Sequence, residues 1–428
     1  MAVDAKLQEI HAAGLPTNGK ELNTYYPVVP DNENAALVMT QAFALMRNYP
    51  DSRSNETAYL KFLPRDQRLT AEQKQVFASY VEMNSAALAK MRESIKLPES
   101  RYPVDYTPGP GTLLPHLGNL HNLAEIVRYE SLLASESGDT TNALAAIENF
   151  VGMAQTLDQE PDIIAQLVRI SLIAIAENSL EHCLNINSLN ESELVGLAST
   201  FSSAEKTNLM ARALTGDRAD HVPVFQLARS KSKNAVELVE GAQQVGGFST
   251  RALDAWLIRE PRFFRAIGFW DRDFCYFLDV METNIALDSI APPRSLVAAD
   301  NFEKANQEME RKHYYLSKLF VTALSKTVIK EASNIAILRT TIAAIATERF
   351  RLAHGRLPEN LNELVPQFLS AVPSDPFAGA PLRYHRIAKG YVIYSVGADG
   401  RDDGGREKPT DWKSSDKTTY DITFTVER

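Results

Sequence analysis

The sequence predicts a mainly α protein, in which a large all-α body of helical hairpins is followed by a small α+β domain. Over residues 31–325, apolar side chains recur at helical spacing between short breaks rich in Pro, Gly and Asn. After residue 380, short stretches rich in Val, Ile, Tyr and Thr alternate apolar with polar residues, as strands do. We therefore expect three parts: a lead-in segment over 1–30, the helical body over 31–325, and the α+β domain over 331–428.

Capping and breaking residues set the expected helix limits in the body. A first helix follows Asp31 and stops before Pro50, and Thr70 with Gln73 has the form of a capping box that opens a long helix ending near Pro98. Three prolines predict an extended linker over 99–114, where the body could divide into two subunits. Helical hairpins should then run to about residue 214. Later helices are expected over 231–243, 251–258 and 301–324. Between the last two lies an aromatic-rich run over 263–288, whose rings should form core.

Composition and charge narrow the possible partners. With 54 acidic and 45 basic side chains the formal net charge is -9, and no cluster of Lys and Arg predicts binding to nucleic acid or to an anionic membrane surface. Charged residues interrupt the apolar stretches before the roughly 18–20 residues that a bilayer requires. The amino end lacks the pattern of a secretory signal. We expect membrane contact only through an N-terminal anchor that is not present in this sequence.

The two cysteines, Cys183 and Cys275, belong to no metal-binding pattern of Cys and His. We interpret them as buried free thiols, although spacing alone also allows a disulfide.

The last hundred residues have an order of elements different from that of the body. A helix over 331–353 should end at Gly355, a residue type that favours helix termination, and a short helix over 361–365 follows. A rigid turn over 372–377 then leads to strands over 382–387 and 391–396, joined as a hairpin, and to a third strand over 420–426. The prediction is one long helix on a small antiparallel sheet of three or more strands.

Three motifs in this region carry a family resemblance: Gly355-Arg356-Leu357-Pro358, Val372-Pro373-Ser374-Asp375-Pro376-Phe377, and Tyr394-Ser395-Val396-Gly397-Ala398-Asp399-Gly400 before Gly404-Gly405. In this order, residues 331–428 resemble the globular domain of a type II secretion major pseudopilin. The whole chain also resembles uncharacterised envelope proteins of planctomycete and verrucomicrobial type that carry such a tail. Pseudopilins begin with a very hydrophobic helix, whereas a long body of another character precedes the module here, so we do not expect an ordinary fibre subunit.

The resemblance implies a calcium site in the loop after Gly-Ala-Asp-Gly. This loop is rich in oxygen donors, which calcium prefers as ligands. It contains no Cys or His, which zinc would favour, so calcium is the expected metal. Asp399 matches the family motif, and the later acidic positions align loosely. The alternative interpretation is a solvated acidic turn. The candidate ligands are Asp399, Asp402, Asp403, Asp411 and Asp416.

Other potential chemistry is sparse. His121 and Glu125, four residues apart with His116 nearby, are interpreted as a surface pair because no further ligand has metal-site spacing. Asp271 and Asp273 lie among aromatic residues, as paired acids of sugar-cleaving enzymes do, but residues two apart on a helix point to different sides.

We therefore expect a non-catalytic structural or interaction protein of the cell envelope or periplasm, with protein partners that could include secretion components. A cytoplasmic location stays open. The alternative is an enzyme or small-ligand-binding protein with a groove under the 99–114 linker, lined by Tyr102, Tyr106 and His116.

Overall fold

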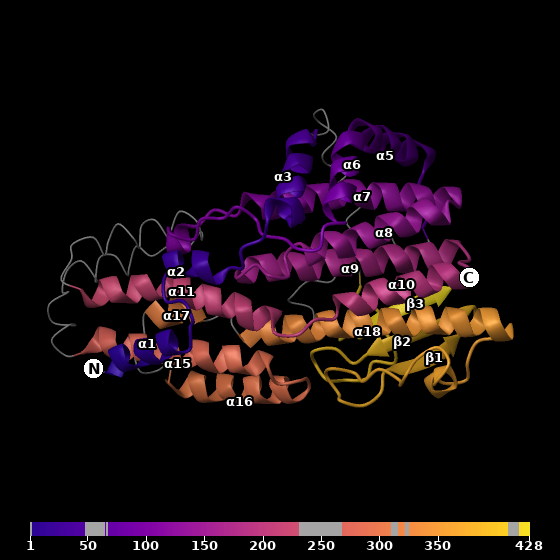
Figure 1. Ribbon diagram of the computed structural model, residues 1–428. Helices are drawn as coiled ribbons and strands as arrows, with labels where there is room; N and C mark the ends of the chain where they lie inside the picture. The colour runs from indigo at the N-terminus through magenta and orange to yellow at the C-terminus, as the bar shows by residue number, and fades with distance from the viewer. Residues whose placement is uncertain are drawn as a thin grey trace.

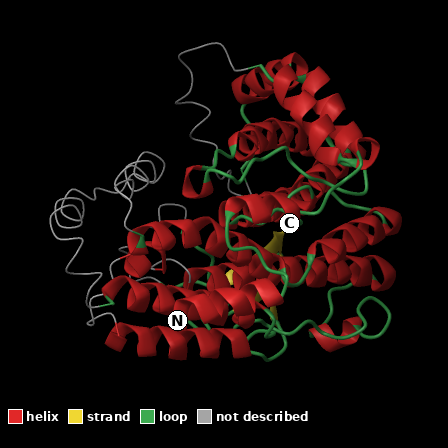
Figure 2. Cartoon of the chain, turned by 60° about the vertical axis from the view of Figure 1, so that its left-hand side comes forward, coloured by secondary structure: helices red, strands yellow, loops and turns green. Residues whose placement is uncertain are grey.

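The computed structural model describes residues 2–47, 65, 67–230, 268–309, 316–321, 325–409 and 419–428. Long helices lie side by side through most of the molecule, and a small antiparallel sheet lies beneath one of them (Figure 1). The strands occupy one small region among the helices (Figure 2). The predicted class, mainly α with a small α+β domain, is confirmed.

The middle of the body consists of four helices joined by short connections: α7 (Pro115–Ser137), α8 (Thr140–Gln155), α9 (Ile163–Ile186) and α10 (Glu191–Ala204). Helix α8 packs on α9, and α7 contacts both. Their starts are defined by side chains that accept hydrogen bonds from free backbone amides: Asp139 caps α8, Asp162 caps α9, and Asn190 with Glu193 forms a capping box on α10.

A second group of helices surrounds α11 (Leu209–Arg229) and α15 (Phe269–Asp288), which pack on each other. Phe225 of α11 stacks on Phe274 and Phe277 of α15, with ring centroids 5.0 and 4.5 Å apart, so the described part of the aromatic run forms core as predicted. The start of the run, over 263–267, lies outside the described residues. The lead-in segment joins this group. Its helices α1 (Ala2–Ala12) and α2 (Gly19–Tyr25) pack on α15 and α11, and α16 (Arg294–Met309) and α17 (Leu316–Val321) complete the group.

The helix expected over 70–97 is instead two helices, α5 (Ala71–Met83) and α6 (Ser85–Ser94), which meet at Asn84. The Asn84 amide group donates to Arg47 O (3.2 Å) and accepts from Arg47 N (2.8 Å). This pairing holds the residues after α3 (Ala35–Leu45) against the break. The break therefore depends on a contact between distant segments, which the local helical pattern does not contain.

Other limits also moved. Helix α16 begins at Arg294, before the expected residue 301, and α17 is a separate helix. The linker over 99–114 is extended as predicted, apart from one turn of 3-10 helix over Gly109–Gly111. The helices expected over 231–243 and 251–258 lie outside the described residues.

The C-terminal region contains α18 (Ser325–His354), the short 3-10 helix η4 (Leu361–Leu364), and strands β1 (Arg383–Ile387), β2 (Gly390–Ser395) and β3 (Ile422–Glu427). The sheet is antiparallel in the order β1-β2-β3, with Ile393 opposite both Tyr384 and Phe424. Helix α18 begins six residues before the expected start and ends at Gly355, whose φ of 67° suits glycine. The predicted helix on a three-stranded sheet is confirmed.

Helix α18 also belongs to the body. It packs on β2 and β3, and on α9 and α10, so that Ile345 and Phe350 share one hydrophobic core with Ile393 of the sheet and Ile173 of α9. In Figure 1, α18 lies lengthwise between α10 and the sheet.

The outer edge of β3 is covered by side chains of α9. Thr425 N donates to Glu181 (2.7 Å), Asn185 Nδ2 donates to Thr425 O (2.9 Å), and Glu427 N donates to Asn185 Oδ1 (2.6 Å). These bonds satisfy backbone groups that an edge strand would otherwise expose to another chain.

By length and composition alone, one helix among the described residues, α9, is long and apolar enough to cross a membrane. The expectation that charged residues interrupt every such stretch is therefore wrong for α9. In this structure it is a core helix that contacts α7, α8, α11 and α18. Its Cys183 is a buried free thiol, as expected, and Cys275 is also free but only half-buried.

We expect Gly216→Ala to lower the free energy of unfolding by about 3 kcal/mol, because the new Cβ would lie 1.8 Å from the Pro161 carbonyl oxygen, where α11 meets the start of α9. Gly118→Ala in α7 is the matched control: nothing lies within 4 Å of its Cβ, and the change should stabilise by up to about 1 kcal/mol. Urea unfolding measures both. Equal effects would contradict this close helix packing.

Candidate functional site

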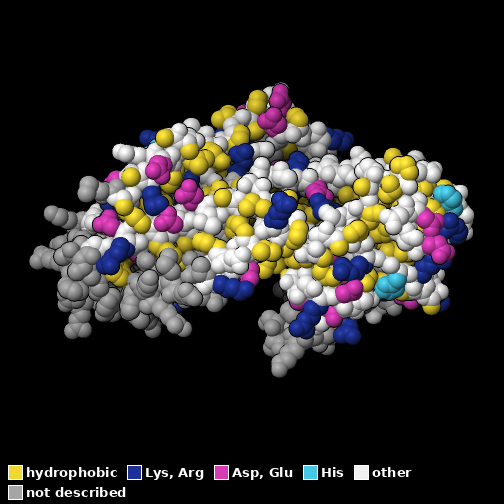
Figure 3. Space-filling model, turned by 90° about the horizontal axis from the view of Figure 1, so that it is seen from below, with side chains coloured by type: hydrophobic (Ala, Val, Ile, Leu, Met, Phe, Trp, Pro, Cys, Tyr) yellow, Lys and Arg dark blue, Asp and Glu magenta, His cyan; other side chains and the backbone are white. Residues whose placement is uncertain are grey.

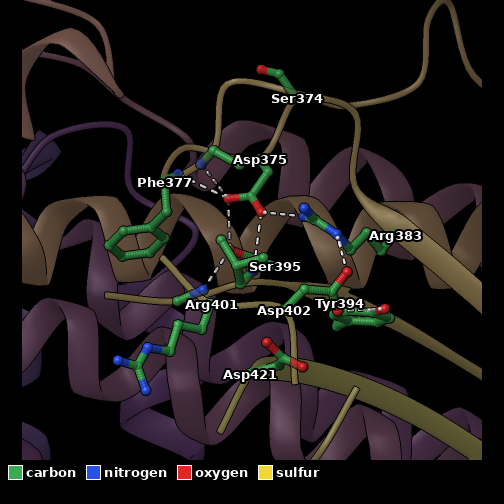
Figure 4. Close-up of polar contacts among 12 residues, drawn as sticks. Ser374, Asp375, Phe377, Arg383, Tyr394, Ser395, Arg401, Asp402 and Asp421 are labelled. Atoms are coloured by element: carbon green, nitrogen blue, oxygen red, sulfur yellow. Dashed lines mark hydrogen bonds and ion pairs between the residues drawn. The ribbon is translucent and has the colours of Figure 1, made fainter. Parts of the chain in front are cut away.

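Asp375, in the predicted rigid turn, is the centre of a polar network that ties this turn to the end of β2 (Figure 4). Its carboxylate is fully buried and accepts hydrogen bonds from Phe377 N (2.8 Å), Ser395 Oγ (2.8 Å) and Val396 N (3.0 Å). Arg383 of β1 lies 3.4 Å away as the charged partner. Asp375 thus fixes the turn to the sheet, and its oxygens are occupied by protein donors.

Asp402, one of the predicted calcium ligands, is committed to the same network. It accepts from Arg383 Nε (2.9 Å), Tyr394 Oη (3.0 Å) and Gly404 N (3.0 Å). Burial raises the pKa of Tyr394 to about 12, and the Asp402 charge adds to this shift. Burial opposes ionisation of Asp402, but the hydrogen bonds from Gly404 N and Tyr394 outweigh it, so the pKa of this carboxyl is lowered.

Asp403 lies beside Asp421, which the sequence predicts as part of the third strand and not as a site residue. Asp421 accepts from Gly405 N (2.7 Å) and Asp403 N (3.4 Å), and its pKa is raised by burial. Asp403 Oδ1 accepts from Thr419 Oγ1 (2.8 Å), and Asp403 Oδ2 is buried with no hydrogen-bond partner. Sequence reasoning did not identify Asp421 as part of this network, because it begins a stretch that alternates apolar with polar residues and was therefore interpreted only as strand.

The remaining predicted ligands are Asp399, Asp411 and Asp416. Asp399 is exposed and accepts a hydrogen bond from Arg401 N (3.0 Å) of its own turn. Asp411 and Asp416 lie outside the described residues. Over the described ranges, no group of three or more His, Cys, Asp or Glu side chains is placed to hold a metal ion.

The three residues expected to line a groove are instead sealed inside the body. Tyr102 and Tyr106 are fully buried, and His116 stacks on Tyr102 with centroids 4.3 Å apart. His116 Nε2 lies 2.8 Å from the buried carboxylate of Glu160, to which Tyr106 Oη also donates at 3.4 Å. The aromatic residues of the linker thus fasten it to α7 and to the α8–α9 connection, and they cannot contact a ligand from solvent. The nearby His121 is exposed and Glu125 half-buried, as expected of surface residues.

A cavity does lie beside the first residues of this linker, in a different place. It has a volume of about 490 Å³ and is bounded by residues 27–35, 95–100, 152–159 and 203–206. Lys206 forms an ion pair with Asp158 in its wall, and Asp158 also accepts from the fully buried Arg169 at 2.7 Å.

The pair Asp271 and Asp273 is divided between two structural roles. Asp271 pairs with Arg229 at 2.6 Å on the surface of α15. Asp273 is fully buried and accepts from Leu316 N (2.9 Å) and Ser317 N (3.2 Å) at the start of α17. The two carboxylates do not face a common cleft, as the helical spacing predicted.

One buried acid, Asp220, and two half-buried acids, Asp162 and Asp217, gather where α11 meets the start of α9. Burial raises the pKa of Asp162 to about 7 and that of Asp220 to about 8, and Asp217 is also raised by burial. Neighbouring charges add to two of these shifts: Glu160 and Asp217 raise the pKa of Asp162, and Asp162 and Asp217 raise the pKa of Asp220. Asp162 accepts from Ala165 N as the α9 cap, and Asp220 Oδ1 has no partner.

Comparison of the chain with known family models, curated proteins and solved structures finds no match.

The buried acids predict that the protein is less stable at pH 8 than at pH 5. Because both folded-state pKa values lie above the ordinary value of 3.8, the folded chain binds more protons than the unfolded chain between about pH 4 and 8. The free energy of unfolding contributed by these groups therefore falls as pH rises through that window. Asp220→Asn should flatten the decline and stabilise at pH 8 by about 1–3 kcal/mol.

Urea unfolding at pH 5, 7 and 8.5 measures this dependence. Asp300→Asn, in an exposed pair with Lys304, is the control and should change stability by less than about 0.5 kcal/mol at each pH. An unchanged pH slope in Asp220→Asn would mean that this carboxyl is ionised in the folded protein.

Proposed function

We propose that this protein is a non-catalytic interaction protein of the cell envelope, located in the envelope or periplasm, whose pseudopilin-like C-terminal module is docked on its helical body. The observation that carries the proposal is the position of α18, which has the sheet on one side and α9 and α10 on the other. The motifs in the turn and strands support the likeness of the module, and the docking accounts for the departure from an ordinary fibre subunit.

Polar contacts across this contact region support stable docking. Arg339 of α18 pairs with Glu205 after α10 (2.7 Å) and donates to Ser374 O (2.9 Å), so it joins body, helix and turn. Arg349 pairs with Glu191 at the start of α10 (2.6 Å). Because α18 and the β3 edge are both occupied within the chain, contacts with partners would use the remaining surface of the body and the β1 side of the sheet.

The surface and the buried acids both agree with binding to proteins. On the face seen in Figure 3, Lys and Arg are interspersed with Asp and Glu and with apolar side chains, which suits neither nucleic acid nor an anionic bilayer. Among the buried carboxylates described above, Asp273 and Asp375 join separate segments of the chain, as structural groups do.

Crosslinking in cells of the native source tests this function. We expect the chain in the envelope fraction, with lysine crosslinks from the body to envelope or secretion components. A chain found only in the cytosolic fraction, or one that turns over a small substrate, would contradict the proposal.

We further propose that calcium stabilises the loop between β2 and β3, with Asp403 as the main ligand and Asp399, Asp411 and Asp416 as further donors. The partnerless Asp403 oxygen supports this, because a buried unpaired carboxylate oxygen is costly and a cation would satisfy it. Asp402 is a weaker candidate, since three donors already occupy it.

Millimolar calcium should raise the melting temperature of the EDTA-treated chain by about 2 °C or more, since binding to the folded state alone stabilises it. Asp403→Asn should remove the increase, and Asp105→Asn, in an exposed turn far along the chain, should retain it. Differential scanning calorimetry with and without calcium measures both. An unshifted wild-type transition would end the calcium proposal and leave the interaction proposal intact.

A further inference from the structure

We infer that the cavity beside residues 95–100 binds a small amphipathic molecule, with an apolar body and one anionic group such as a carboxylate. This inference goes beyond the interaction function, because it assigns a ligand site to the helical body. Its volume of about 490 Å³ lies within the range of about 300–1,000 Å³ that is typical of small-molecule sites.

The cavity is formed where four separated parts of the chain meet. The N-terminal segment, the residues after α6, the end of α8 and the residues at the end of α10 each contribute to the wall. Gly152 permits close contact between two of these parts, since a Cβ there would lie 2.9 Å from Ile95. The segment bearing Glu99 is fixed by backbone hydrogen bonds, from Ala35 N to Glu99 O (2.8 Å) and from Glu99 N to Glu33 O (3.4 Å). The walls are therefore held by the fold before any ligand binds.

One part of the lining is apolar and would receive the body of the ligand. Aliphatic and proline side chains share this part, and none of them carries a group that needs a hydrogen bond. They are Pro27, Val29, Ile95, Leu97 and Pro98.

The charges at the other part favour an anion. Two cations, Lys206 and Arg169, share the single carboxylate of Asp158, so this group carries a net positive charge. Arg169 is fully buried and also donates to Ala204 O (2.7 Å), which fixes it in place. The Lys206 side chain is 43% exposed and lines the cavity, so its ammonium group can pair with a ligand while it keeps Asp158.

The neighbouring acids do not cancel this charge. Glu205 is taken by Arg339. Glu331 faces Arg169, but burial raises its pKa to about 7, so it is partly neutral at pH 7. Glu99 belongs to the lining but is exposed, so water screens its charge.

Ser100 supplies a free hydrogen-bonding group. Ser100 belongs to the wall and is only 8% exposed, and its buried Oγ has no partner, so rotation about the Cα–Cβ bond would turn the hydroxyl toward a ligand. Two other groups of the wall are occupied: Thr156 Oγ1 donates to Met153 O (2.7 Å), and Gln155 Nε2 donates to Ser203 Oγ (3.0 Å). Leaving a buried hydroxyl unpaired is unfavourable, and an oxygen of the ligand would relieve this.

Binding of octanoate, octanol and octylammonium to the full chain tests the inference, by displacement of the fluorescent probe 8-anilinonaphthalene-1-sulfonate. The dissociation constant of octanoate, measured by displacement, should be at least about tenfold lower than that of octanol, because only the anion can form a charge-assisted hydrogen bond with Lys206. Lys206→Gln should remove most of this preference, and Ser100→Ala should weaken octanoate by about threefold or more.

Lys74→Gln is the matched control. The Lys74 side chain is 42% exposed and pairs with Glu136, a carboxylate as buried as that of Asp158, but it lies away from the cavity. It should leave octanoate binding unchanged. Gln155→Trp, from the half-buried wall of α8, should fill the cavity and abolish probe binding, with thermal unfolding used to check that each variant folds.

Three results would overturn the inference. Octanol or octylammonium binding as tightly as octanoate would refute the anion preference. Equal losses in Lys206→Gln and Lys74→Gln would refute the role of Lys206, and undiminished binding in folded Gln155→Trp would place the probe elsewhere. None of these results bears on envelope location or docking of the module.

Discussion

The burial of α18 on two sides is the constraint on which the rest of the structure depends. A helix that packs on a sheet and on other helices at once has little surface left for polar groups, and several of its buried positions are alanine, which allows close approach. Buried threonines are tolerated because Thr340, Thr341 and Thr347 donate to carbonyls of the preceding turn at 2.7–2.9 Å. The sheet and helices α7–α10 therefore share one core through α18, and the hydrogen bonds between β3 and α9 join them a second time.

Charged groups complete this arrangement where apolar packing ends. Glu348 of α18 is almost fully buried, and it is paired with Arg351 of its own helix and with Arg428 at the C-terminus. A buried carboxylate without such partners would be strongly unfavourable. The last residue of the chain thus closes the contact between the sheet and α18, and it also donates to Asn187 O (2.6 Å) after α9.

The same principle explains most of the buried acids. Asp158 and Asp375 each accept hydrogen bonds from two different segments, and Asp273 of α15 accepts them from the start of α17, so each joins separate parts of the chain. These acids are fully or almost fully buried. A pattern such as two acids among aromatic rings, which resembles a catalytic pair in the sequence, therefore marks residues that stabilise the fold here. The partnerless oxygens of Ser100 and Asp403 differ from them, because the fold leaves these two groups unsatisfied, and this is why both proposals for binding rest on them.

Local signals in the sequence were sufficient for much of the fold. The capping box at Thr70 and Gln73 is present with both of its hydrogen bonds, Gly355 ends α18, and the strands lie within about two residues of their expected limits. These features arise from interactions between residues close in sequence, or from the alternation that burial of one face imposes on a strand. A pattern of this kind identifies an element wherever the element is placed.

Only the tertiary structure decided how these elements use their side chains. The break at Asn84 comes from its bonds to Arg47, the burial of Tyr102 and Tyr106 comes from contacts with Glu160 and His116 in other parts of the chain, and the cavity forms from four distant segments. The sequence by itself determined the types of element, their order and the helix-on-sheet module at the end. It did not determine which polar groups are sealed and which stay available, because that depends on contacts between residues far apart in the chain.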